Sequence, residues 1–122
     1  MAIHDMTAWQ LTEQLQARQI TAVEAVQACY DRIDTLDGQV KAFLTLTRES
    51  ALEQARAIDS ARAAGEKLPP TAGLPIAHKD GLSTAAVRTT CASRMLENYV
   101  PAYDATVVER CRDAGMIMLG KT

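Results

Sequence analysis

Apolar residues in the first part of the chain recur with the period of an α-helix. Leu11 and Leu15 lie four residues apart, and Thr7 with Gln10 before them has the spacing of a capping box. A second helix is predicted to begin at Thr21, which forms another capping-box pair with the glutamate three residues on. The apolar stripe of this second helix consists of Val23, Val26, Tyr30, Ile33 and Leu36.

The Asp-Gly pair at 37–38 is expected to end the second helix, because glycine favours helix ends. Residues 41–47 are rich in β-forming side chains, which predicts either a strand or an extended connection. A third helix is predicted from about Arg48 to Ala64, with Gly65 as its stop. Its inward-facing residues are expected to be Leu52, Ala55 and Ile58.

The pattern changes at residues 66–73, where two prolines and a glycine predict a linker. Residues 74–80 are predicted to form a short buried strand that ends in charged residues. A compact helix follows, with Asp104 as its N-cap and Gly115 as its stop, and residues 116–119 are a second buried strand. The residues of this helix expected to face inward are Val107, Val108, Cys111 and Ala114. Strand, helix and strand in that order predict a parallel α/β arrangement.

At 122 residues the chain is one domain at most. Within it, residues 1–65 are predicted to be mainly helical, 66–73 to be a linker, and 74–122 to start an α/β core. A net charge of -2 and 4% aromatic residues give no general footprint for nucleic acid. No signal peptide or membrane-spanning run is present, and three scattered cysteines suit a reducing compartment, so the expected location is cytoplasmic.

The last eight residues, 115–122, match the phosphate-binding pattern G-x-x-x-x-G-K-[ST]. A working phosphate loop follows a strand and opens a helix. Here a predicted helix precedes Gly115, and the four residues between the glycines are apolar. Because the order of elements is reversed, nucleotide binding at 115–122 is disfavoured and a core strand is preferred.

Lys79 is the most suggestive polar residue, because it lies at the end of an apolar strand, where α/β sheets place ligand sites. A lysine withdrawn from water is able to act as a base. The alternative from chemistry alone is a solvated pair of Lys79 with Asp80. His78 has only the distant His4 as a second imidazole, so a structural role is favoured over a metal site.

Three further residues near Lys79 carry nucleophilic side chains, namely Ser83, Cys91 and Ser93. Cys91 with Lys79 and Glu97 would resemble the residue set of nitrilase-type amidases, but nothing besides sequence proximity connects them. A small buried cysteine is the simpler interpretation of Cys91.

Four ungapped motifs in the second half of the chain resemble the amidase signature family, and the helical first half resembles the amino-terminal region of that family. The motifs are LPIAHKD, RTTCAS, ENYVPAYDATVVER and LGKT. The likeness covers nearly the whole chain and is greatest to the A subunits of tRNA-dependent amidotransferases. It implies an α/β/α sandwich with a mixed sheet, of which this chain holds the amino-terminal helices and the first strand-helix-strand elements.

The resemblance implies a Ser–cis-Ser–Lys triad in which Lys79 matches the catalytic lysine. A serine attacks the amide carbonyl, and a second serine relays its proton toward the lysine. In the family, the glycine- and serine-rich signature with both serines lies downstream of LGKT. Residues 1–122 are therefore expected to be inactive alone.

The resemblance also implies partners and a substrate. The whole protein would hydrolyse glutamine and pass ammonia to the B and C subunits of a heterotrimeric amidotransferase, which act on misacylated Glu-tRNA(Gln). No metal or organic cofactor is expected in this chain, while ATP with Mg is implied for the partner subunit. The alternatives are a stand-alone amidase of the same family and a non-catalytic truncated piece.

This sequence departs from the family pattern in the segment after Lys79. Ala86 stands where glycine is common, so a positive φ there would strain the backbone. Ala102 replaces a frequent second proline, and Gly81 is unusual directly after Asp80.

Overall fold

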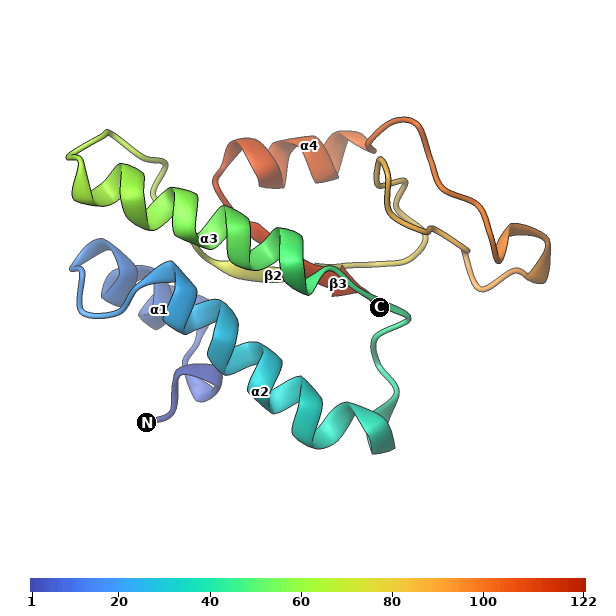
Figure 1. Cartoon of the computed structure of the whole chain (residues 1–122), viewed down its shortest axis with the longest axis horizontal. Coiled ribbons are helices and arrows are strands. Elements are labelled where there is room, and N and C mark those ends of the chain that lie inside the picture. The colour runs from blue at the N-terminus through green and yellow to red at the C-terminus, as the bar shows by residue number, and fades with distance from the viewer.

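The computed structural model describes all residues from 1 to 122 and has a mixed α/β fold. Its elements, in chain order, are η1 (Ile3–Asp5), α1 (Ala8–Gln16), α2 (Ala22–Val40), β1 (Thr45–Leu46), α3 (Arg48–Ala63), β2 (Pro75–His78), η2 (Arg94–Leu96), α4 (Thr106–Asp113) and β3 (Ile117–Lys121). Figure 1 shows the helices α1, α2 and α3 gathered at one end, and the connection between β2 and α4 extending away at the other.

The three strands form one sheet in the order β1-β3-β2. β3 pairs in parallel with β2 and antiparallel with β1, so the mixed sheet and the parallel strand-helix-strand unit expected from the sequence are both confirmed. Gly120 allows the close approach of β1, because a Cβ atom at this position would lie 2.2 Å from the carbonyl oxygen of Thr45.

Both predicted capping boxes are present, at Thr7 with Gln10 and at Thr21 with Glu24. The start of α2 has a further cap from α3, because the carboxylate of Asp59 accepts the backbone N–H groups of Ala22 at 2.8 Å and of the following residue at 3.0 Å. These contacts join the two helices at the point where α2 begins.

The predicted end of the second helix is wrong. α2 continues through Gly38 to Val40 and ends on Lys41, which has a left-handed backbone with φ 56°. The carboxylate of Asp37 accepts the backbone N–H of Ala42 at 2.7 Å. Asp37 thus stabilises the chain after the helix, and glycine in the last turn is tolerated.

The main hydrophobic core lies between the first three helices and the sheet. Tyr30 is fully buried, and its hydroxyl donates a 2.8 Å hydrogen bond to the carbonyl oxygen of Leu119. From the predicted stripe of α2, Val26 and Tyr30 are buried, whereas Leu36 is 37% exposed. The core comprises Leu11, Leu15, Ala22, Ala25, Val26, Tyr30, Ala51, Ala55, Leu74, Ile117 and Leu119.

Two predictions about α4 are wrong. The helix begins after Ala105 without any side-chain cap, because Asp104 binds the backbone N–H of Ala85 and the guanidinium of Arg112 instead. Val107, expected to face inward, is 44% exposed, while Val108 is buried. The helix is eight residues long, and Val108 is its only buried residue.

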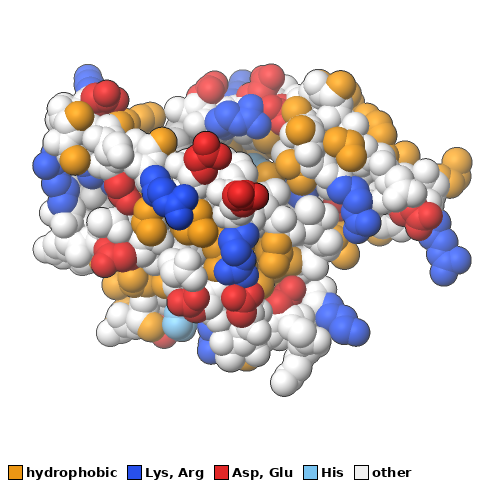
Figure 2. Space-filling view, in the orientation of Figure 1, with side chains coloured by type: hydrophobic (Ala, Val, Ile, Leu, Met, Phe, Trp, Pro, Cys, Tyr) orange, Lys and Arg blue, Asp and Glu red, His pale blue; other side chains and the backbone are white.

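Charges of both signs are mixed on the face of the molecule that Figure 2 shows. Figure 2 shows Lys and Arg side chains interspersed with Asp and Glu on the face in view, in agreement with the net charge of -2. No helix is long and apolar enough to cross a membrane. Large hydrophobic side chains are exposed on the connection between β2 and α4, namely Met95, Tyr99, Val100 and Tyr103.

Candidate active site

Lys79 follows β2 directly, at the carboxyl end of the strand, as the sequence predicts. Its side chain is exposed, but its backbone is fixed on both sides by Thr122. The N–H of Thr122 donates to the carbonyl oxygen of His78 at 2.9 Å, and the N–H of Asp80 donates to the carbonyl oxygen of Thr122 at 2.8 Å. The parallel ladder therefore extends one step past β2 and sets the position of Lys79.

The alternative prediction of a solvated pair between Lys79 and Asp80 is wrong. Asp80 is 2% exposed, and its carboxylate accepts hydrogen bonds from both the backbone N–H and the hydroxyl of Thr90. Burial disfavours the charged carboxylate. The bonds from Thr90 and the charge of Lys121 outweigh this effect and hold the pKa of Asp80 below its usual value.

Lys121 is fully buried at the end of β3. Its ammonium donates to the carbonyl oxygen of Leu82 at 2.6 Å, to the hydroxyl of Thr84 at 2.7 Å and to the hydroxyl of Thr89 at 3.0 Å. All three donors of the ammonium are thus used. Burial lowers the pKa of Lys121, and the nearby carboxylate of Asp80 partly offsets this change.

A bulge in the pairing of β2 with β3 explains why the side chain of Lys121 is buried on the opposite face of the sheet from the apolar core. Ile76 pairs with Met118 and Ala77 with Gly120, so Leu119 has no partner on β2. After this extra residue Lys121 pairs with His78. Paired residues of parallel strands point to one face, so Lys121 lies on the His78 face and not on the face of Leu119.

The phosphate-loop interpretation of residues 115–122 fails on this geometry. Gly115 ends α4 with φ 76°, and the residues that follow form β3. The lysine of the motif binds protein oxygens inside the molecule. The expectation of a core strand is confirmed. The strand runs further than predicted, however, and includes Gly120 and Lys121, which the sequence pattern left as the start of a turn.

The segment after Asp80 is tied to α4 and to the chain before it. The carboxylate of Asp104 accepts the backbone N–H of Ala85 at 2.8 Å, and the N–H of Ala105 donates to the carbonyl oxygen of Ser83 at 2.7 Å. Ala86 has φ 62°, which is the positive φ that would strain an alanine there. Gly81 has no positive φ, and a Cβ atom built at this position would have no neighbour within 4 Å. Neither the backbone conformation nor the available space therefore requires glycine at position 81.

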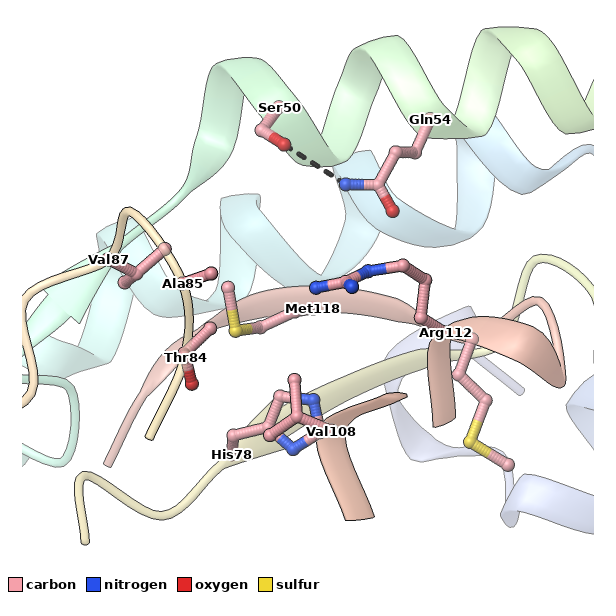
Figure 3. A pocket seen from close by; sticks show the side chains of 10 residues that line it. Ser50, Gln54, His78, Thr84, Ala85, Val87, Val108, Arg112 and Met118 are labelled. Carbon is pink, nitrogen blue, oxygen red and sulfur yellow. Dashed lines mark hydrogen bonds between the residues drawn. The ribbon is translucent and has the colours of Figure 1, made fainter. Parts of the chain in front are cut away.

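Beside this segment, a cavity of about 120 Å³ lies between the sheet, α3 and α4 (Figure 3). His78 is 6% exposed and lines this space together with Thr84, Met118 and Arg112. Burial, together with the positive charges of Lys121 and Arg112, lowers the pKa of His78, so this imidazole is neutral at pH 7. The structure holds no cluster of His, Cys, Asp and Glu able to bind a metal.

The other nucleophilic residues are not joined to Lys79. Cys91 is exposed, contrary to the expectation of a buried cysteine, and no hydrogen bond links it to Lys79 or Glu97. The hydroxyl of Ser93 accepts the N–H of Met95 and so caps η2. The structure therefore brings together Asp80, Lys121 and the threonines, and leaves the nucleophile candidates apart.

Sequence reasoning missed Lys121, Thr89 and Thr90 as a unit. One signal was available. Lys121 follows an apolar strand, and a lysine buried there needs hydrogen-bond acceptors, which the hydroxyls of Thr84, Thr89 and Thr90 are able to supply. The bulge that aims Lys121 at these hydroxyls has no sequence signature apart from Gly120.

Comparison with known proteins places this geometry in a family. The family model described as Amidase matches residues 24–122. The chain belongs to the amidase family. The fold agrees, because a solved peptide amidase from Stenotrophomonas maltophilia superposes on 97% of this chain with a TM-score of 0.88 and 31% identity.

A second similar solved structure comes from a vestigial protein complex that reveals the evolutionary origins of an s-triazine catabolic enzyme. It covers 95% of this chain and 26% of its own, with a TM-score of 0.90 and 33% identity. Among curated proteins, the A subunit of glutamyl-tRNA(Gln) amidotransferase from Moorella thermoacetica is 54% identical over 99% of this chain. Its counterpart from Thermobifida fusca is 53% identical over 96%. This amidase-family chain spans about a quarter of the length of these relatives, 25% and 24%.

Proposed function

We propose that this chain supplies the lysine of an amide-hydrolysing site, with Lys79 as that residue. The observation that carries the proposal is the position of Lys79 at the carboxyl end of a parallel strand, between two backbone hydrogen bonds to Thr122. Family membership supports the same reaction class. The side chain of Lys79 is exposed within residues 1–122, so it is free to meet groups from elsewhere in a complete site.

The proposed reaction follows a Ser–cis-Ser–Lys triad whose two serines lie outside residues 1–122. The nucleophilic serine attacks the amide carbonyl, and its proton passes through the second serine to the amine of Lys79. The same proton is then donated to the leaving nitrogen, which departs as ammonia and leaves an acyl-enzyme. Water hydrolyses this ester and regenerates the serine.

Glutamine is the amide favoured by the similarity to the amidotransferase from Moorella thermoacetica, whose A subunit is 54% identical to this chain. In that proposal the ammonia passes to the B and C subunits of a heterotrimeric amidotransferase in the cytoplasm. A partner subunit uses ATP with Mg to activate misacylated Glu-tRNA(Gln), which then accepts the ammonia. This chain itself contributes no cofactor site to the amide step.

A stand-alone amidase acting on another carboxamide is the second candidate. The similarity to a peptide amidase, with a TM-score of 0.88 over 97% of this chain, favours it. Either activity needs the serines, so we expect residues 1–122 alone to be inactive. Turnover by the isolated chain, lost on Lys79→Ala, would contradict the Ser–cis-Ser–Lys proposal.

A chimera provides the test, with residues 1–122 replacing the matching quarter of the Moorella thermoacetica protein, together with the other subunits of that enzyme. We expect Lys79→Ala to lower glutamine hydrolysis by about 10 000-fold. Lys67→Ala is the matched control, because Lys67 is an exposed lysine in the 66–73 connection. Full activity of Lys79→Ala would refute the role of Lys79.

The same chimera separates the two substrates. Release of ammonia from glutamine with little hydrolysis of peptide amides supports the amidotransferase function. The opposite preference supports the stand-alone amidase and leaves the role of Lys79 intact.

A further inference from the structure

Lys121 stands apart from the other lysines of the chain. Lys41, Lys67 and Lys79 are exposed, whereas Lys121 has 0% of its surface accessible. Burying a charge for stability alone is inefficient, since apolar replacements of similar volume are often neutral or stabilising. A buried ammonium with all three donors satisfied indicates that the position of its partners matters.

The partners of Lys121 all belong to the segment that follows Lys79. They are the carbonyl oxygen of Leu82 and the hydroxyls of Thr84 and Thr89, at 2.6, 2.7 and 3.0 Å. The two hydroxyls donate in turn to backbone carbonyls, Thr84 to Leu82 and Thr89 to Val87, each at 3.1 Å. Lys121 therefore fixes the backbone of residues 82–89 against β3.

The carboxylate of Asp80 completes the network from the other side. It accepts the N–H and the hydroxyl of Thr90, the residue after the Lys121 partner Thr89. Asp80 and Lys121 carry opposite charges and hold two consecutive threonines. The segment from 80 to 90 is thus closed into a loop whose two ends and middle are anchored to the carboxyl ends of β2 and β3.

Lys79 lies at the base of this loop. Its backbone is bracketed by Thr122, which follows Lys121, and it directly precedes Asp80. A displacement of the loop would therefore move Lys79 relative to the strand. Amide hydrolysis is sensitive to such changes, because a misplacement of about 1 Å is able to cost about 100-fold in rate.

We propose that Lys121 is a positioning residue for Lys79. Its ammonium holds the 82–89 segment against β3, and together with Asp80 and Thr90 it keeps the backbone of Lys79, from which the exposed side chain extends, at a fixed place beside the end of the sheet. This inference rests on the proposed amide-hydrolysing role of Lys79. It assigns Lys121 no contact with the substrate.

The test uses the Moorella thermoacetica chimera with Lys121→Met, which removes the ammonium and keeps a long unbranched side chain. We expect kcat for glutamine to fall about 100-fold while KM stays within about threefold. Amide hydrogen exchange of residues 80–92 is expected to accelerate by about tenfold or more. Ile117→Val, a core change in the same strand, is the control and is expected to alter neither kcat nor this exchange.

Thr89→Val serves as the second variant, because it preserves shape and removes one acceptor of the ammonium. If Lys121→Met does not fold, a fall in kcat with unchanged KM in Thr89→Val supports the proposal. Unchanged kcat in that variant contradicts it. A normal kcat in folded Lys121→Met, or an equal loss in Ile117→Val, also contradicts it.

Different outcomes of these experiments contradict the proposed function and the positioning role of Lys121. If Lys79→Ala retains full activity in the parent chimera, the role of Lys79 is wrong. If Lys79→Ala is inactive and Lys121→Met is fully active, only the positioning role is wrong.

Discussion

Different interactions stabilise the two halves of the molecule: apolar packing in the helical half, and buried hydrogen bonds and charges in the polar half. The helices α1 to α3 pack through apolar side chains such as Leu15, Val26 and Ala55, all essentially without exposed surface. The segment from 79 to 92 buries Asp80 and Thr89 together with Lys121 of β3 instead. Apolar packing tolerates exchange of similar side chains, whereas a polar network requires each partner in place. The helical half thus supports the fold, and the polar half sets the geometry of the candidate site.

The largest expected effect tests the apolar half. Leu15→Ala removes a side chain that is 1% exposed, so we expect the free energy of unfolding to fall by about 2–5 kcal/mol. Leu36→Ala on α2, where the leucine is 37% exposed, is the matched control and should cost less than about 1 kcal/mol. Urea unfolding of the chain measures both. Equal losses would remove the distinction between core and surface in the helical half.

The next largest expected effect concerns the polar half and is measured as the pH dependence of the free energy of unfolding. The folded pKa of Asp80 lies below its usual value of 3.8, so its charge stabilises the fold at neutral pH. That contribution is present above the unfolded pKa and is lost as the pH falls through the lower, folded pKa. We expect Asp80→Asn to cost about 1–3 kcal/mol at pH 7 and to reduce the loss of stability below pH of about 4.

Asp34→Asn is the control for this measurement, because Asp34 forms an exposed ion pair with Arg48. It should change stability by less than about 1 kcal/mol. Urea unfolding at a series of pH values gives the comparison. An unchanged acid slope in Asp80→Asn would show that the network is not held by the charge of this carboxylate.

A smaller effect concerns the buried hydrogen bond that Tyr30 makes inside the apolar half. Tyr30→Phe removes the hydroxyl that donates to the carbonyl oxygen of Leu119 and preserves the ring. We expect a loss of about 1 kcal/mol, since this carbonyl oxygen also accepts the N–H of Thr47 at 3.0 Å. Thermal unfolding of both proteins measures the difference. A loss as large as that of Leu15→Ala would mean that the helical half also depends on polar contacts.

The smallest expected effect is a gain in the free energy of unfolding. Ala86 has φ 62°, and glycine relieves that strain while adding freedom to the unfolded chain, so Ala86→Gly should stabilise by about 0.5–1 kcal/mol. Ala102→Gly is the control, because Ala102 has no positive φ and should only lose stability. Urea unfolding decides the sign. Destabilisation by both changes would show that the loop tolerates alanine at 86 without strain.

The helical half was predictable from the sequence because its determinants are local. The capping pairs Thr7 with Gln10 and Thr21 with Glu24 are three residues apart, and the stripe that buries Val26 and Tyr30 has helical period. The errors arise where a side-chain contact overrides a simple signal. The second helix continues past Gly38 to Val40, and Asp37 stabilises the chain that follows it. Asp104 binds Arg112 and the N–H of Ala85, so it does not cap α4.

The polar half was predictable only in part. The position of Lys79 after a strand followed from the apolar run before it. The burial of Lys121 did not, because it depends on a register shift between β2 and β3 and on threonines that are 32 and 37 residues away. Periodicity describes one strand at a time and carries no information on such a shift.

The role of Lys79 is tested most directly by the first turnover of glutamine in the Moorella thermoacetica chimera, with and without Lys79→Ala. Rapid mixing with excess enzyme measures release of the first ammonia, which isolates the acylation step from later transfer. We predict that this release slows by about 1 000-fold or more in Lys79→Ala and is unchanged in Lys67→Ala. First-turnover release at the parent rate in Lys79→Ala would contradict the assignment of Lys79 to the amide-hydrolysing site.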